Sequence, residues 1–249
     1  MAFLSYPVEV VGAAALCVAL AAATRRLSGF GFALIGAPLL SVFFPPQQMV
    51  AIVLWLQVFL GVSSIVEFRS ELDWPVLRQL AFGGALTAPL GVVMLIYTDP
   101  DVVLFIMGIC VIVAASILGF FPRLIMVRAT PSSNVASGML AGLMSSSVGM
   151  PGPPLAIYFM GQTDMAPNRR RAMLITTFSL LACVSLGVAF LGGQIRSTSL
   201  WMALALLVPA LVGSYIGEQL HTHLNRKLVE RFALSLVFLS GFLCLVRAF

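Results

Sequence analysis

Hydroxyls, glycines and prolines gather in one short stretch in the second half of the chain. Residues 145–154 read SSSVGMPGPP and lie within apolar sequence. Proline lacks a backbone N–H and clashes with the preceding turn, so we expect no helix to run through Pro151, Pro153 and Pro154. Irregular backbone at membrane depth is tolerated only where it lines a cavity or is buried in protein. We therefore interpret this stretch as a binding site for something polar. The site residues predicted from it are Ser145, Ser146, Ser147, Gly149, Pro151, Gly152 and Pro153.

A similar pattern occurs near the amino terminus. Residues 28–31 read SGFG and are followed by Pro38-Leu39, as the first stretch is followed by Leu155. Arg25 and Arg26 stand just before this second motif. If the preceding apolar run crosses the membrane fully, these arginines mark an ordinary cytoplasmic end. If the run turns back, they lie near a tip facing the membrane centre, which the position of the motif favours. The site residues predicted here are Arg25, Ser28, Gly29, Phe30 and Gly31.

These residue types together favour the binding of an anion. After each interruption the next helix begins with unpaired N–H groups and the positive end of its dipole, which attract negative charge. Glycines let the backbone approach a ligand, and Arg25 would add a forked cation. Gln57, an amide within a long apolar run, is a further candidate for lining the path. The alternative for any single serine or glycine is close helix packing, which explains Gly83-Gly84 and Gly142 well.

The composition indicates a polytopic membrane protein. Of the 249 residues, 60% are hydrophobic and 9% charged, and the mean hydropathy is +1.06. A soluble domain has roughly 25% charged residues. The apolar runs are continuous, which favours helices over the alternating strands of a β-barrel. The net charge of +5 comes from bases spread over separate loops, so we expect no nucleic-acid partner.

The chain lacks the groups that metal sites, cation pathways and intramembrane enzymes need. All nine acidic residues lie in loops or at the ends of apolar runs, which disfavours a cation transporter. The two histidines, His221 and His223, are two residues apart and do not share a helix face. No HExxH, GxSxG or Walker motif is present. We therefore expect no enzyme activity, no metal and no cofactor.

The apolar runs predict an all-α bundle of about 8–10 membrane segments. The first two runs and the sixth and seventh are short, so each pair could form a hairpin of half-helices that enters and leaves by the same side. Residues 1–125 and 126–249 each read as such a hairpin followed by three spans, with the second copy inverted. Inverted repeats with interrupted segments at matching positions are typical of secondary transporters with a central site. The ten runs are Val8–Ala23, Phe30–Phe44, Met49–Val66, Leu77–Tyr97, Val102–Phe121, Val135–Val148, Leu155–Met160, Ala172–Leu191, Leu200–Gly217 and Phe232–Val246.

The distribution of basic residues predicts the orientation. With the amino terminus outside, the arginines and lysine of the loops fall almost entirely on the inside, as the positive-inside rule requires. The outside loop 98–101 carries no base. The inside loops are 67–75, 121–134, 161–171 and 218–231.

The paired motifs resemble those of the TauE/SafE family of bacterial membrane proteins. Arg25 and the following LSGFG match an RxxSGFG pattern of some members, and GMPGPPL at 149–155 with Arg171-Ala172 is similar to the second motif. That motif is commonly near GxGGPP in the family, and Met150 and Pro151 interrupt it here. The resemblance favours Arg25 facing the site.

The resemblance also implies what the protein carries. It suggests a bacterial inner-membrane transporter of sulfite or of an organosulfonate such as sulfoacetate. We expect alternating access with the anion held at the midplane between the two tips. A small-anion channel with the same site, or an intramembrane enzyme, is the alternative. The expected partners are the small anion and the lipid bilayer, and the sequence leaves open whether the protein is a monomer or a homodimer.

Overall fold

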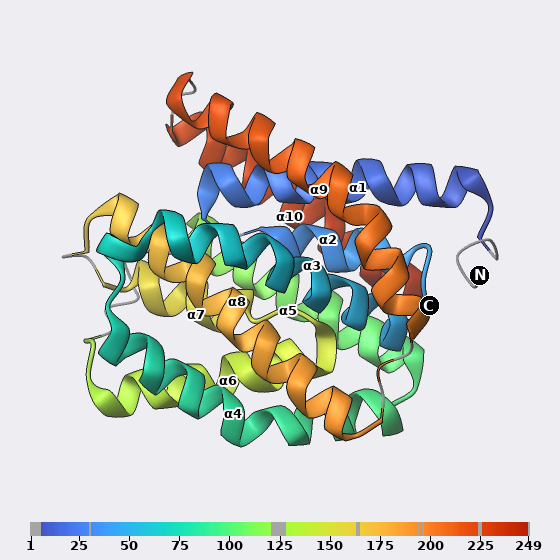
Figure 1. Ribbon diagram of the computed structural model, residues 1–249, viewed down its shortest axis with the longest axis horizontal. Coiled ribbons are helices and arrows are strands. Elements are labelled where there is room, and N and C mark those ends of the chain that lie inside the picture. The colour runs from blue at the N-terminus through green and yellow to red at the C-terminus, as the bar shows by residue number, and fades with distance from the viewer. Residues whose placement is uncertain are drawn as a thin grey trace.

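The computed structural model describes residues 6–29, 31–120, 128–162, 165–193, 195, 197–223 and 226–248, and within them every regular element is helical (Figure 1). This confirms the all-α prediction. A short 3₁₀ turn, η2, spans Arg69–Glu71. The α-helices are α1 (Val8–Ser28), α2 (Phe32–Ser41), α3 (Pro46–Glu67), α4 (Trp74–Tyr97), α5 (Pro100–Phe120), α6 (Pro131–Val148), α7 (Gly152–Met160), α8 (Pro167–Leu191), α9 (Ser197–His223) and α10 (Arg226–Ala248).

The helix lengths confirm a multi-pass membrane protein and show how the two interrupted segments are divided into helices. Within the described residues, six helices are long and apolar enough to cross a membrane. One of them is α1, whose 21 residues extend over about 31 Å at 1.5 Å per residue, the thickness of a bilayer's hydrocarbon core. Of the two alternatives that the sequence leaves open for the first run, this length favours a full crossing by α1. Each hairpin pairs a long arm, α1 or α6, with a short one, α2 or α7, because the interruption falls late in the apolar sequence.

Glycines in left-handed backbone conformations form the two tips. Gly29 follows α1 with φ of +80°, and Gly31 precedes α2 with φ of +124°. Gly149 follows α6 with φ of +74°. As expected, no helix runs through the three prolines: α6 ends at Val148, before Pro151, and α7 begins at Gly152, just before Pro153 and Pro154. Both lie in the first turn of α7, where the missing N–H would be unpaired in any case.

The packing of the helices is compatible with the two predicted repeats, which stay a prediction. If α6–α10 are counterparts of α1–α5, then α4 against α6 corresponds to α9 against α1, and both contacts are extensive. The counterpart pairs α3 with α8 and α5 with α10 also pack on each other. The boundary predicted between residues 125 and 126 lies outside the described residues and stays a prediction.

Small residues bring the paired helices into backbone contact. A Cβ added to Gly142 of α6 would lie 2.3 Å from the Cα of Gly84 on α4. A Cβ added to Gly213 of α9 would lie 2.1 Å from the carbonyl oxygen of Ala19 on α1. The interpretation of Gly83-Gly84 and Gly142 as packing residues is therefore confirmed.

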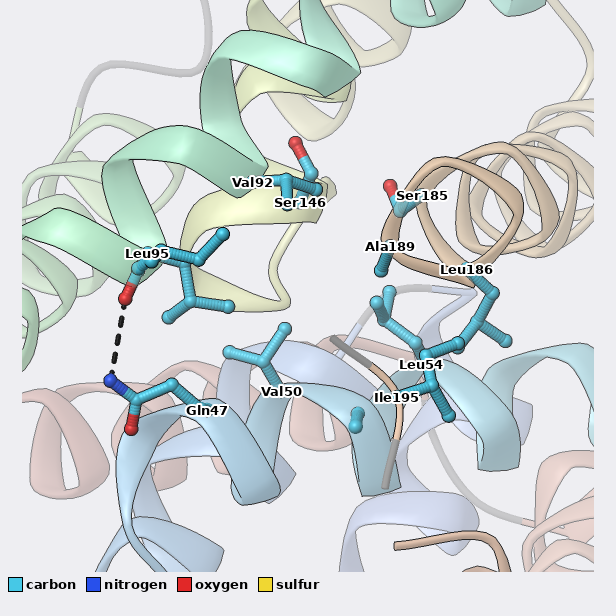
Figure 2. Close-up of a pocket in the computed structure, with 12 residues that line it drawn as sticks. Gln47, Val50, Leu54, Val92, Leu95, Ser146, Ser185, Leu186, Ala189 and Ile195 are labelled. Carbon is cyan, nitrogen blue, oxygen red and sulfur yellow. Dashed lines mark hydrogen bonds between the residues drawn. The ribbon is translucent and has the colours of Figure 1, made fainter. Parts of the chain in front are cut away.

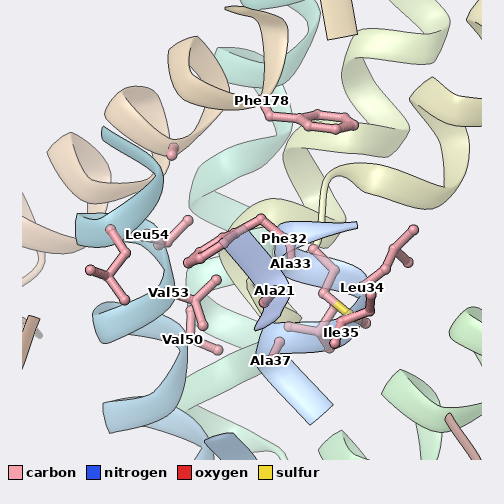
Figure 3. Close-up of a cluster of buried hydrophobic side chains, with 14 of the residues drawn as sticks. Ala21, Phe32, Ala33, Leu34, Ile35, Ala37, Val50, Val53, Leu54 and Phe178 are labelled. Carbon is pink, nitrogen blue, oxygen red and sulfur yellow. The ribbon is translucent and has the colours of Figure 1, made fainter. Parts of the chain in front are cut away.

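The short helix α2 lies in the centre of the protein. Almost all its residues are buried, and Figure 3 shows Phe32 on the side of Val53 of α3, with Leu34 on the other side of α2. A helix end at membrane depth needs protein around it, since lipid offers no hydrogen bonds to its free backbone groups. The core therefore explains how the chain can be interrupted at this depth.

Candidate functional site

Arg25 is a buried cation without a carboxylate partner among the described residues. It lies in the last turn of α1, only 1% of its surface is exposed, and it is one of the largest fully buried side chains. Its Nη2 donates to the Oγ of Ser179 at 3.3 Å. Its Nη1 is buried and has no hydrogen-bond partner, and no Asp or Glu of the described residues forms an ion pair with it. Burying a charge costs several kcal/mol, and no carboxylate of the described residues offsets that cost here.

The guanidinium of Arg25 bonds to the middle of α8, at a residue that packs on α3. Ser179 is the central residue of the 25-residue α8. It stands directly against Gly61 of α3, where an added Cβ would lie 2.1 Å from the Ser179 Oγ. The cation is therefore held at the contact between counterpart helices of the two repeats.

Two further polar side chains of this contact have unpaired buried atoms. Gln57, one helical turn before Gly61, donates from Nε2 to the carbonyl oxygen of Gly149 at 3.4 Å, and its Oε1 has no partner. Thr176, one turn before Ser179 on the same side of α8, is fully buried and its Oγ1 has no partner. Buried polar groups normally have hydrogen-bond partners, so unpaired ones at one contact indicate a place for water or a ligand.

The first turns of the two short helices meet. A Cβ added to Gly152, the first residue of α7, would lie 3.1 Å from the Cγ of Leu34 in the first turn of α2. The glycines before these helices pack on opposite repeats, Gly29 against Arg171 of α8 and Gly149 against Val50 of α3. The geometry therefore brings the two N-terminal helix ends together between the repeats.

The three serines of the second motif bond within the protein. Ser146 and Ser147 donate to the carbonyl oxygens of Gly142 and Leu143, at 2.8 and 2.7 Å. Ser145 accepts a 2.8 Å bond from Ser185 of α8. The hydroxyl protons of Ser146 and Ser147 are thus already used in this conformation. Among the described residues Arg25 keeps a donor without a partner, and ligand contacts of the serines stay a prediction.

Ion pairs join the helices at one end of the bundle, which we call the ion-pair end. Arg26 pairs with Glu67 at 2.6 Å and with Glu218 at 3.5 Å, and Arg171 pairs with the same Glu218 oxygen. Arg169 pairs with Asp73 at 3.0 Å. Three of these four pairs involve residues at the end of α3, at the start of α8 or in the turn before α4. Two of the four, Arg26–Glu218 and Arg169–Asp73, join the predicted repeats, so charged contacts hold the repeats together at this end.

A comparison with models of known protein families shows to which family the chain belongs. The model of the sulfite exporter TauE/SafE family matches residues 14–243, nearly the whole chain. The chain belongs to the TauE/SafE family. No curated protein and no solved structure matches it. The family implies a membrane transporter of the sulfur-anion exporter type, which the buried arginine and the paired helix ends fit.

A small cavity lies at the opposite end of α3 in this TauE/SafE protein. Figure 2 shows it between α3, α4, α6 and α8, with Ser146 and Ser185 on its wall, and its volume is about 40 Å³. Gln47, in the first turn of α3, also lines it and donates to the carbonyl oxygen of Leu95 at 3.4 Å. A water needs roughly 10–15 Å³ of such space, so the cavity has room for a few waters.

The remaining predicted site residues lie at separate positions in the structure or outside its described part. Phe30 lies outside the described residues, and Ser28 is the last residue of α1, without a described side chain. Pro151 directly precedes α7, and Pro153 lines an apolar groove between α5, α6 and α7. Within the described residues no three of His, Cys, Asp or Glu are grouped to hold a metal.

The sequence analysis missed the polar residues of α8. Ser179 and Thr176 reach the Arg25 site, but they were not selected from an otherwise ordinary apolar run. The signal was the cluster of hydroxyls at 176, 177 and 179 near the centre of a predicted span. Arg26 was considered together with Arg25, and only the structure shows that Arg26 has carboxylate partners whereas Arg25 has none in the described part of the chain.

Proposed function

We propose that this protein carries small sulfur-containing anions, such as sulfite or an organosulfonate like sulfoacetate, across the bacterial inner membrane. The observation that carries the proposal is the buried guanidinium of Arg25, whose Nη1 has no partner among the described residues. An oxyanion bound there would supply both the missing negative charge and the missing acceptor. Membership of a sulfite exporter family supports a sulfur oxyanion as the cargo.

The proposed mechanism is alternating access, without a cofactor or covalent chemistry. The packing of counterpart helices supports a movement of one repeat against the other around a central anion. Arg25 on α1 and Ser179 on α8 belong to different repeats, so such a movement would change the surroundings of the cation. The partners are then the anion and the surrounding lipid, and the working unit is a monomer or a homodimer.

The proposed orientation places the ion-pair end in the cytoplasm and the amino terminus in the periplasm. The ion pairs support this because they gather Arg26, Arg169 and Arg171 at one end, as the positive-inside rule expects of a cytoplasmic face.

A ligand screen of the purified protein tests the anion site. A ligand that binds only the folded state stabilises it by about 2.7 kcal/mol at 100 times its Kd. We expect sulfite or sulfoacetate to raise the unfolding temperature, in a panel with sulfate, thiosulfate, taurine and simple carboxylates. Arg25→Ala should abolish that rise, whereas Arg78→Ala, at an exposed position of α4, should keep it. An unchanged rise in Arg25→Ala would refute the proposed site.

Transport in proteoliposomes separates a transporter from a channel. Unlabelled sulfite on the far side should accelerate the entry of labelled sulfite, because a carrier returns faster when it is loaded. A rate that depends only on the gradient would indicate a channel. Chemical conversion of the recovered anion would indicate an enzyme.

A further inference from the structure

One carboxylate at the ion-pair end is held by arginines of both repeats. The Oε2 of Glu218, on α9, accepts from Arg171 Nη2 on α8 and also from Arg26 Nη1 on α1, at 3.5 Å. A single oxygen between two guanidinium groups is the arrangement that a small bound oxyanion would have. The pair Arg26–Arg171 therefore already holds an anionic group, which the protein itself supplies.

The two arginines are sheltered, and the carboxylate covers them. The side chains of Arg26 and Arg171 are 12% and 11% exposed, against 39% for Glu218. The Nε of Arg171 is buried and has no hydrogen-bond partner, so this guanidinium has a donor to spare. A ligand that replaced Glu218 would thus find more donors than the glutamate uses.

Neither arginine depends on Glu218 for its position. Glu67 holds Arg26 independently at 2.6 Å. The guanidinium carbon of Arg171 lies 5.5 Å from the centre of the Phe68 ring, and the Cα and Cγ of Arg171 pack against Gly29. The pair would remain in place if the glutamate moved away.

We propose that Arg26 and Arg171 form a second anion site, on the cytoplasmic side of Arg25, which Glu218 occupies as a tethered substitute for the cargo. The inference rests on the proposed function for the identity of the cargo, a small sulfur oxyanion. Arg26 is the chain neighbour of Arg25, and Gly29 of the first tip touches Arg171, so the second site adjoins the first. A cargo anion passing between the site at Arg25 and the cytoplasm displaces the carboxylate. That exchange breaks the contact that Glu218 makes between the repeats and opens this end.

Neutralising Glu218 tests the second site. Glu218→Gln keeps the size of the side chain but removes its charge, so sulfite no longer competes with a carboxylate. In isothermal titration of the detergent-solubilised protein with sulfite, we expect one binding event for the parent and two for Glu218→Gln. Adding Arg171→Ala to Glu218→Gln should return the count to one.

Asp73→Asn is the matched control. It removes the Arg169–Asp73 ion pair at the same end with the same change of charge, while an Asn still caps α4. We expect one event for this variant. A second event in Asp73→Asn would show that any lost carboxylate at this end admits sulfite, which would overturn the assignment to Arg26 and Arg171. A single event of parental affinity in folded Glu218→Gln would overturn it as well.

Two more variants distinguish a failure of the second site from a failure of the site at Arg25. Arg25→Ala combined with Glu218→Gln should retain one event, at the second site. Its loss would overturn the second site, whereas an unchanged count of two would instead overturn Arg25 as the first site. If Glu218→Gln does not fold, the shorter carboxylate of Glu218→Asp reaches the arginines less well. That variant should show a second binding event that the parent lacks, and a single event of parental affinity would contradict the inference.

Discussion

Arg25 of α1 and Ser179 of α8 are joined by a hydrogen bond of 3.3 Å between Nη2 and Oγ. Ser179 also donates to the carbonyl oxygen of Ile175, at 3.0 Å, so its hydroxyl accepts from the guanidinium. The bond joins the two predicted repeats and fixes the orientation of the buried guanidinium. Its Nη1 has no hydrogen-bond partner among the described residues. Ser179 is thus a positioning residue for the proposed anion site.

Ser179→Ala should weaken anion binding without removing the cation. A hydrogen bond to a charged group contributes about 1.5–3 kcal/mol, and water can replace part of it, so we expect roughly a tenfold higher Kd for sulfite. Thr177→Ala is the control, because Thr177 makes the same kind of bond to a carbonyl one turn back, that of Met173, without contacting Arg25. Titration calorimetry measures both. Equal losses in the two variants would mean that Ser179 acts only through the packing of α8.

Gly61→Ala should damage both the fold and the site. The added methyl would lie 2.1 Å from Ser179 Oγ, so α3 and α8 must separate or Ser179 must turn away from Arg25. Overpacking of this kind costs about 1–3 kcal/mol. The unfolding temperature should fall, and the sulfite-induced rise should shrink.

Gly187→Ala provides the comparison for Gly61→Ala. Gly187 lies on α8, and nothing stands within 4 Å of its added methyl. Replacing a helical glycine by alanine there should stabilise the protein by about 0.5–1 kcal/mol and leave binding unchanged. If Gly61→Ala behaves like Gly187→Ala, the close contact between α3 and α8 does not exist in solution.

The two tips should tolerate alanine to different degrees. Both Gly29 and Gly149 have a left-handed backbone, which costs a residue with a side chain roughly 1–2 kcal/mol. At Gly29 the methyl would also meet Arg171, 3.0 Å from Cγ and 3.1 Å from Cα, whereas at Gly149 it meets Val50 only at 3.5 Å. Gly29→Ala should therefore lower the unfolding temperature more than Gly149→Ala does. The reverse order would contradict the packing of the first tip on α8.

Gly149→Asn is a second test at the second tip. Asparagine adopts left-handed backbone more readily than alanine does, so this variant should unfold at a higher temperature than Gly149→Ala. Gly149→Leu brings a bulky side chain to the tip and should block transport in proteoliposomes. Full transport by Gly149→Leu would exclude the tip from the path of the anion.

Single cysteines placed in a cysteine-free variant should report the orientation. Positions 9 and 99 are exposed and predicted to be outside, and positions 128 and 168 are exposed and predicted to be inside. A maleimide that cannot cross membranes should label Glu9→Cys and Asp99→Cys in intact cells. Arg128→Cys and Asn168→Cys should react only after the membrane is opened. The opposite labelling pattern would reverse the proposed orientation.

Much of the fold could be predicted because the membrane imposes it. Continuous apolar runs must form helices in lipid, and the end of α6 was read correctly from the stretch that contains Pro151, a residue that cannot continue a helix. The lengths of the hairpin arms could not be predicted in the same way. The small and polar residues of α1 and α6 lower their apparent hydrophobicity, and these residues are accommodated by packing on α9 and α4.

The sequence by itself determined the class of the protein, the two interrupted motifs and the presence of an arginine beside one of them. These follow from local rules, since proline, glycine and charge each restrict the chain at their own position. Only the tertiary structure decided which arginine lacks a counter-ion. Arg25 and Arg26 are adjacent in the chain, but successive residues of a helix face different directions. Arg26 therefore reaches Glu67 and Glu218, whereas Arg25 reaches Ser179 in the other repeat and keeps one donor free.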